Sequence, residues 1–352
     1  MNPASSPALH PISWVAWLAV AISAITITRN PLYLLLILLA LALVAEIERP
    51  AGRTRPIDPI LFAAFAVTIS GLFNAVSVHY GDTVMLRLPA SWPLLGGPIT
   101  LEALAYGMTN GLALGALIAA FAAFGSALPV GALLRLVPRA FYPLAVVVAI
   151  AVTYVPLTIR QARQVREAQQ LRGHQMRSWR DGLPLLLPLL IGGLERALQL
   201  AEALAARGFA AARPPERLRL LLAGGLASAF AGVLLRVAWG QDLVGAALIL
   251  LGAAMTLAVL YVAGRRTPRT HYRIYRWGRY DALALGGAGL ALAALLLPWP
   301  ARQSLFYVTY PTLRAPPFDP LLATALLGLL APLLVRLRPR VNAKSKITKG
   351  SQ

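Results

Sequence analysis

Residues 160–219 separate two long apolar halves of the chain and read RQARQVREAQQLRGHQMRSWRDGLPLLLPLLIGGLERALQLAEALAARGFAAARPPERLR. This is the longest part of the chain that cannot be a membrane span, and it holds 11 of the 33 Lys and Arg residues. Two short units inside it share a pattern, an arginine followed by a glycine: Leu171-Arg172-Gly173 and Ala206-Arg207-Gly208. We interpret the two arginines as docking groups for a soluble partner.

The first unit closes a predicted helix. Helical periodicity runs through residues 157–171, in which Arg163 and Glu167 have the four-residue spacing of a stabilising ion pair. Gly173 then supplies the helix stop, because glycine readily adopts the left-handed conformation in which many helices end. The first arginine is therefore expected at the end of a helix.

The second unit is expected to end a helix in the same way, 35 residues further on. Arg207 falls in the last helical turn, and Gly208 provides the left-handed cap. An arginine there projects beyond the helix body as a rigid forked donor, which suits a bidentate carboxylate in a groove of a partner. The alternative interpretation is local, since a cationic side chain at a helix C-terminus also complements the helix dipole.

The overall composition is that of a polytopic helical membrane protein. Of the 352 residues, 58% are hydrophobic and 13% are charged, whereas a soluble domain has roughly a quarter of its residues charged. Basic residues accumulate on the cytoplasmic loops of membrane proteins, so the net charge of +20 does not indicate a nucleic-acid partner. The chain has no cysteine, which excludes disulfides and thiolate metal sites. We expect no removable signal peptide, because the first ten residues lack Lys and Arg.

Eight apolar segments are predicted to cross the membrane: 11–28, 31–46, 59–78, 101–127, 218–238, 243–263, 282–298 and 320–337. Several begin with a capping side chain before a proline at the first helical position, as in Asn30-Pro31, Asp58-Pro59 and Asp319-Pro320. We therefore predict an all-α integral membrane protein with about eight transmembrane helices and a cytoplasmic helical coupling domain between the fourth and fifth. The predicted divisions are 1–127 and 220–338 for the membrane helices, 128–219 for the coupling domain, and 339–352 for a basic cytoplasmic tail.

Loop charges set the predicted orientation. Arginines are frequent in 47–57 and 264–280, and the C-terminal tail adds further Arg and Lys residues, whereas 79–100 and 299–318 hold few. The basic loops are expected in the cytoplasm and the others outside. The prediction is a multi-pass protein of the cytoplasmic (inner) membrane of a prokaryote, with both termini in the cytoplasm.

Two further apolar runs, 141–158 and 183–205, are predicted to lie on the cytoplasmic side rather than to cross. If each crossed once, six arginines between them would lie outside, against the positive-inside pattern: Arg160, Arg163, Arg166, Arg172, Arg177 and Arg180. Prolines interrupt both runs, and Glu195, Arg196 and Glu202 would each add a cost in the bilayer. Helices at the membrane interface are the expected solution.

No catalytic, cofactor-binding or metal-binding residue is predicted. The chain has no GxxxxGK[ST] motif, so it should not bind ATP through a P-loop. His10, His79, His174 and His271 lack the spacing of metal ligands. Asn74, Asn110 and Glu102 are too few to build a recognisable ion path in the first half.

Two runs carry a family resemblance: ALPVGALLRLVPRAFYPLAVVVAIAVTYVPLTIRQARQVREAQQLRG (127–173) and PLLLPLLIGGLERALQLAEALAARGF (184–209). They resemble the transmembrane T component of energy-coupling factor (ECF) transporters, the permease family of cobalt and vitamin importers. In that family two cytoplasmic coupling helices end in Ala-Arg-Gly-like signatures that dock into grooves of two ATP-binding-cassette ATPases. Ala206, Arg207 and Gly208 match the signature fully, whereas the first unit departs from it with Leu171 before Arg172 and Gly173.

The resemblance implies a non-catalytic scaffold and energy-coupling subunit of an ABC-type importer. Its partners would be two ATPases, which bind the ATP, and a small membrane S component that captures a vitamin or a transition metal. Closure of the ATPases would move the coupling helices and tilt the S component across the membrane. The substrate cannot be read from this chain, because recognition would lie in the partner. The last two spans look like an extension of simpler members of the family.

Two other classes of function compete with this prediction. A self-sufficient secondary transporter would need discontinuous spans with polar residues at the midplane, and such residues are scarce here. An integral membrane enzyme would need a cluster of His, Asp or Glu at one membrane face, and the 13 acidic residues are scattered along the chain.

Overall fold

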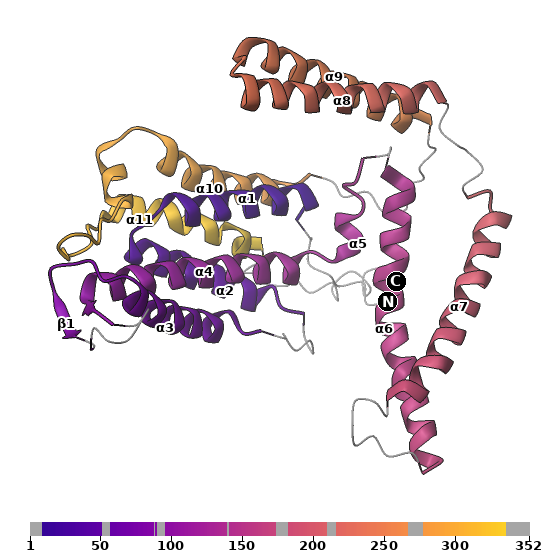
Figure 1. The fold of residues 1–352 in the computed structure, drawn as a ribbon, viewed down its shortest axis with the longest axis horizontal. Helices are drawn as coiled ribbons and strands as arrows, with labels where there is room; N and C mark the ends of the chain where they lie inside the picture. The colour runs from indigo at the N-terminus through magenta and orange to yellow at the C-terminus, as the bar shows by residue number, and fades with distance from the viewer. Residues whose placement is uncertain are drawn as a thin grey trace, which may run out of the picture. The chain divides into compact units, whose positions relative to one another are not determined.

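Helices make up most of the described chain in the computed structural model, which describes residues 9–50, 57–87, 89, 96–138, 141–173, 182–209, 216–266 and 277–335 (Figure 1). The chain divides into two compact units, one of residues 1–129 and 274–352 and the other of residues 130–273. Some predicted features lie outside the described residues, namely the tail 339–352, Arg177, Arg180, His174 and His271.

All eight segments predicted to cross the membrane are helical. They are α1 (Pro11–Ile27), α2 (Pro31–Ile47), α3 (Pro59–Ser77), α4 (Leu101–Ala127), α8 (Glu216–Trp239), α9 (Asp242–Arg266), α10 (Arg279–Leu296) and α11 (Pro320–Leu326), which continues as the 3-10 helix η4 (Leu327–Val335). The predicted all-α membrane fold is therefore confirmed.

The central segment supplies three more helices. They are the short α5 (Val130–Leu133) and the long α6 (Tyr142–Leu171) and α7 (Leu183–Ala206). A 3-10 turn, η3 (Pro300–Leu305), lies between α10 and α11. The loop between α3 and α4 contains a small antiparallel sheet that the sequence did not predict, in which β1 (Val84–Arg87) pairs with β2 (Pro98–Thr100).

Six of the described helical segments are long and apolar enough to cross a membrane, namely α3, α4, α8, α9, α10 and residues 144–171 of α6. The helices α1, α2 and residues 320–334 are apolar but shorter. Length and composition alone would thus let α6 span the bilayer. The placement of 141–158 and 183–205 on the cytoplasmic side stays a prediction.

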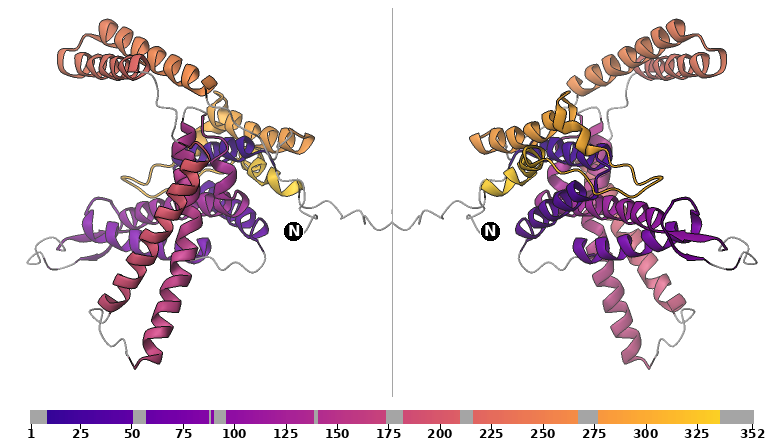
Figure 2. Two further views of the ribbon diagram at one scale, coloured as in Figure 1. Left: turned by 90° about the vertical axis from the view of Figure 1, so that its right-hand side faces the viewer. Right: turned by 90° about the vertical axis from the view of Figure 1, so that its left-hand side faces the viewer.

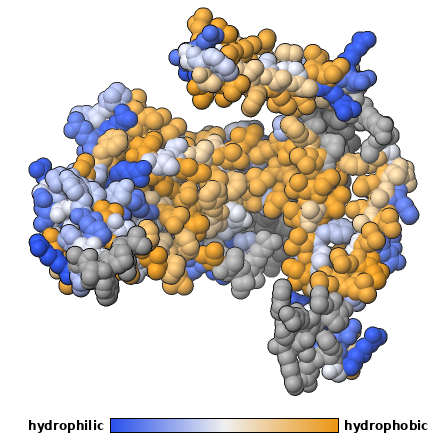
Figure 3. All heavy atoms as spheres, viewed as in Figure 1, coloured by the Kyte–Doolittle hydropathy of each residue, from blue (hydrophilic) through white to orange (hydrophobic). Residues whose placement is uncertain are grey.

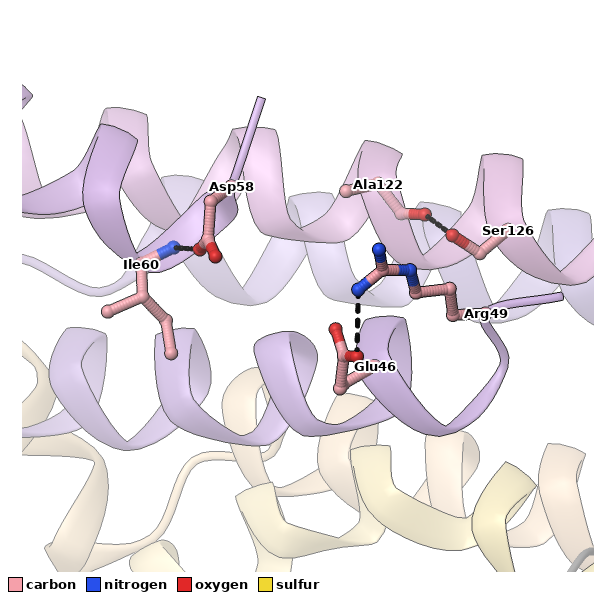
Figure 4. Close-up of polar contacts among 6 residues, drawn as sticks. All are labelled: Glu46, Arg49, Asp58, Ile60, Ala122 and Ser126. Carbon is pink, nitrogen blue, oxygen red and sulfur yellow. Dashed lines mark hydrogen bonds and ion pairs between the residues drawn. The ribbon is translucent and has the colours of Figure 1, made fainter. Parts of the chain in front are cut away.

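The predicted helix starts are confirmed by their capping contacts. Asn30 accepts a hydrogen bond from the backbone N–H of Leu32 (3.0 Å), and Asp319 accepts one from that of Leu321 (2.8 Å). Asp58 caps α3 in the same way, through the N–H of Ile60 at 2.9 Å (Figure 4). Each cap precedes a proline at the first helical position, so local chemistry determines where these helices begin.

Glycines bring α3 and α4 close together in the first unit. A Cβ atom at Gly111 would collide with the backbone of Ala66 and Val67, and one at Gly115 would collide with Ala63. The GxxxG pair of α4 therefore serves packing inside the bundle, where small residues let helix backbones approach closely.

The C-terminal segment is part of the same core. The indole N–H of Trp17 in α1 donates to the carbonyl of Leu329 at 2.9 Å. The amide of Asn30 donates to the carbonyl of Ser304 at 2.8 Å, and the Tyr33 hydroxyl shares a hydrogen bond with the Ser304 hydroxyl at 2.8 Å. These residues are buried or nearly so, so α10 to η4 complete the bundle around α1 and α2.

Helix ends in the first unit gather as the predicted topology requires. The N-termini of α1 and α10 meet where Asp281 accepts the N–H of His10 (2.6 Å) and the hydroxyl of Ser13 (2.9 Å). The loops predicted to be external also meet, since the N–H of Asp82 donates to the carbonyl of Pro311 at 3.3 Å. Figure 4 shows the end of α2, the start of α3 and the end of α4 in one region, as expected if these ends share a membrane side.

In the second unit, α8 and α9 pack on each other through glycines. Added Cβ atoms at Gly225, Gly232, Gly245 and Gly252 would meet the backbone of the opposite helix. An ion pair between Arg236 and Asp242 (2.9 Å) closes the turn of this hairpin. Apolar side chains cover both helices in the space-filling view (Figure 3), as suits a hairpin in lipid.

Candidate functional site

The first Arg-Gly unit forms the C-terminal cap of α6. Leu171 is the last helical residue, Arg172 has φ −85° and ψ 9°, and Gly173 has φ +84°. The Gly173 N–H donates to the carbonyl of Gln170 at 3.0 Å. The positive φ explains the glycine, because a residue with a side chain is strained in the left-handed region.

The second unit caps α7 with nearly the same backbone. Arg207 has φ −87° and ψ 7°, and Gly208 has φ +71°. The Gly208 N–H donates to the carbonyl of Ala205, and the Phe209 N–H donates to that of Leu204, both at 2.9 Å. This pair of hydrogen bonds is the Schellman motif. The predicted helix stops at both glycines are confirmed.

All six residues of the two units are exposed, and Leu171 is 90% exposed. The guanidinium groups of Arg172 and Arg207 form no hydrogen bond or ion pair with any described residue. Each arginine therefore offers its full set of donors outward from the end of a helix. Nothing in the fold of the described residues uses them.

One sequence prediction in this region is wrong. Arg163 and Glu167 of α6 form no ion pair in the part of the chain that the structure describes, although their spacing permits one. Both side chains are exposed. In water such a pair gains little over two separately hydrated charges, which explains why spacing alone did not produce it.

The half-buried residues of α7 form one stripe along the helix. They recur every three or four positions, and they are Leu185, Leu189, Gly192, Arg196, Leu200 and Leu204. The side chain of Arg196 crosses to α6, where its Nη1 donates to the Oε1 of Gln161 at 2.6 Å. The sequence analysis missed this contact and treated Arg196 only as a charge unsuited to a membrane span.

The two helices run in opposite directions, so their C-terminal ends lie at opposite ends of the pair (Figures 1 and 2). At 1.5 Å per residue, α6 and α7 extend over roughly 45 and 36 Å. The two exposed arginines are therefore far apart, each at the free end of its own helix. Such an arrangement can hold two separate partner proteins.

Two polar residues that the sequence singled out in the first unit make contacts within the fold. The Asn74 amide donates to the carbonyl of Ala103 (2.6 Å), and the buried Glu102 carboxylate accepts the N–H of Thr83 (3.1 Å). Two cavities in this unit, of about 640 and 300 Å³, are lined almost wholly by apolar side chains. Within the described ranges no group of three or more His, Asp or Glu could hold a metal ion.

Comparison with known proteins finds one matching family. Residues 6–217 match CbiQ, described as cobalt transport protein. The match contains both Arg-Gly units and ends at the start of α8, so most of α8 and all of α9, α10 and α11 lie beyond it.

Two curated relatives are similar to part of the chain. Both are named energy-coupling factor transporter transmembrane protein EcfT. The protein from Leuconostoc gelidum is 30% identical over 174 residues, which is 47% of this chain and 57% of that protein. The protein from Listeria innocua is 34% identical over 93 residues, which is 25% of this chain and 35% of that protein. The chain thus spans about half the length, or less, of the curated relatives it matches.

Proposed function

The chain belongs to the CbiQ cobalt transport family, and from that premise we propose that it is the energy-coupling transmembrane subunit of an ECF-type importer. The observation that carries the proposal is the pair of exposed Arg-Gly helix ends, alike in backbone conformation and placed at opposite ends of an antiparallel pair. The names of the relatives and the multi-pass helical fold support it.

The partners at the two ends would be two ABC-type ATPases. Each arginine would enter a groove and donate two parallel hydrogen bonds to a carboxylate, which the planar guanidinium does better than a lysine could. Neither guanidinium is engaged by a described residue, so both are available to a partner, and each side chain would become ordered on binding. This chain would bind no ATP itself.

The transport step would depend on a third kind of subunit. A substrate-binding membrane S component would capture a vitamin or a transition metal. Movement of the ATPases during ATP hydrolysis would displace the α6–α7 pair and so reorient that subunit.

Substitution of the arginines tests the proposal. Loss of one partner of a buried, hydrogen-bonded charge pair costs on the order of 2–5 kcal/mol, or about 30-fold to several thousand-fold in affinity at that contact. We expect Arg172→Ala and Arg207→Ala each to reduce transport strongly without preventing membrane insertion. The double variant should no longer co-purify with the ATPases.

Arg163→Ala is the matched control, because Arg163 is exposed on α6 but stands inside the helix and not at its glycine cap. It should have little effect. If the arginines only complement helix dipoles, each is worth at most about 1 kcal/mol of local stability. Normal ATPase co-purification and normal transport by the double variant would decide for that local role.

A further inference from the structure

The contact between α6 and α7 falls at equivalent positions of the two helices. The two arginine caps are 35 residues apart, and the same offset relates Gln161 to Arg196. Gln161 stands 11 residues before Arg172, and Arg196 stands 11 residues before Arg207. Each interval corresponds to about 16 Å of helix. The hydrogen bond between Gln161 and Arg196 is therefore equally far from both Arg-Gly ends.

Other features repeat between the helices. Each begins with a proline in its first turn and has a second proline inside it, at Pro156 in α6 and at Pro188 in α7. Each is apolar in its first half and carries its charged residues in its second half. The charged second halves of the two helices thus meet at the Gln161–Arg196 hydrogen bond, although their prolines are not related by the same 35-residue offset.

The lack of a side chain at Gly192 leaves room for the hydrogen bond between Gln161 and Arg196. A Cβ atom at Gly192 would collide with the side-chain amide nitrogen of Gln161, whereas one at the adjacent Gly193 would have nothing within 4 Å. The Gln161 side chain is flexible, so a methyl group at position 192 could be accommodated only if the amide moved away. That movement would separate it from Arg196.

We propose that the Gln161–Arg196 hydrogen bond, with the clearance at Gly192, is the pivot that fixes the spacing of the two Arg-Gly ends. Gln161 and Arg196 are then positioning residues for coupling. The rest of the α7 stripe is leucine, whose apolar contacts permit sliding, while one polar contact at a helix interface fixes register.

The proposal rests on the proposed function, because a fixed spacing matters only if both ends bind partners at once. Because the Gln161–Arg196 contact is equally far from the two ends, a displacement of either bound partner acts on this α6–α7 contact over the same length of helix.

The spacing can be measured on the full chain without any partner. The chain has no cysteine, so spin labels can be attached at Gln170→Cys and Ala205→Cys, two exposed positions related by the same offset. We expect one narrow distribution of label distances in the chain that retains the pivot. Arg196→Ala, Gln161→Ala and Gly192→Ala should each broaden or shift it. An unchanged distribution in all three variants would overturn the proposal.

Matched control variants separate loss of the Gln161–Arg196 contact from a general disturbance of the fold. Gly193→Ala and Gln164→Ala should leave the distance distribution as it is, because neither position touches the contact. A broad distribution in either control would contradict the pivot.

Transport gives a second, separate readout. In the Arg196→Ala complex both arginine caps remain, so the ATPases should still co-purify and hydrolyse ATP. Transport per ATP hydrolysed should fall about 10- to 150-fold, the range that corresponds to a lost hydrogen bond to a charged group. Unchanged transport per ATP in the Arg196→Ala variant would contradict the pivot. Co-purification of the ATPases with the Arg172→Ala, Arg207→Ala double variant would instead contradict the proposed function.

Discussion

At the scale of single residues, the two Arg-Gly caps depend on backbone conformation and not on packing. A Cβ atom at Gly173 or Gly208 would have nothing within 4 Å, so only the positive φ demands glycine. The same openness leaves room for Leu171 where the resemblance predicts alanine. Its side chain is 90% exposed, and it changes what is presented to a partner without changing the helix end.

Gly208→Ala should therefore loosen the end of α7. The left-handed conformation costs roughly 1–2 kcal/mol for a residue with a side chain. The amide of Phe209, which donates to the carbonyl of Leu204, should then exchange its hydrogen about 5- to 30-fold faster. Hydrogen exchange followed by mass spectrometry measures this. Gly193→Ala on the same helix is the control and should not accelerate exchange there, and equal exchange in both variants would contradict the account.

At the scale of helices, the features that the sequence predicted correctly are those that local chemistry determines, such as the helix starts. Asn30, Asp58 and Asp319 marked helix starts correctly, because a cap acts within three residues of itself. Contacts such as that of Trp17 with Leu329 could not be predicted, because they join residues hundreds of positions apart. The Gln161–Arg196 contact lies between these cases, since the sequence shows the 35-residue offset but not that the two side chains meet.

The membrane side of α6 and α7 is open to a direct test. Gln170→Cys and Gln199→Cys are exposed positions that should react with an impermeant thiol reagent only from the cytoplasmic side. Met85→Cys, in the strand of the loop predicted to be external, is the opposite control and should react from outside. If α6 crosses the membrane, as its length and composition allow, Gln170→Cys will react in intact cells.

The pairing of α8 with α9 makes a sharper prediction for two neighbouring glycines. A Cβ atom at Gly225 would press on Thr256 and on the backbone of Gly252, whereas one at Gly224 meets only the Met255 side chain at 4.0 Å. Gly225→Val should destabilise the hairpin by about 1–3 kcal/mol through overpacking. Gly224→Val should cost less. Thermal unfolding of the purified variants compares them, and equal melting temperatures would contradict close packing at Gly225.

At the scale of the whole molecule, the family match and the fold have different boundaries. The match ends at residue 217, yet the helices from α10 onward contact α1 and α2 through buried polar groups such as Asn30 and Ser304. The sequence identified these last helices as an extension, but it could not show that they complete the N-terminal bundle. The structure makes them part of the first unit, while both Arg-Gly caps belong to the second.

Site-specific cross-linking can show whether both helix ends bind ATPases. Single cysteines at Leu171 and at Ala206, in this otherwise cysteine-free chain, place a short thiol–amine cross-linker beside each arginine. In membranes that contain the assembled transporter, we predict a cross-linked product with an ATPase from each position. A cysteine at Met85, on the loop predicted to be external, should give none. Cross-linking to an ATPase from neither Leu171→Cys nor Ala206→Cys, in a transporter that still transports, would contradict the account.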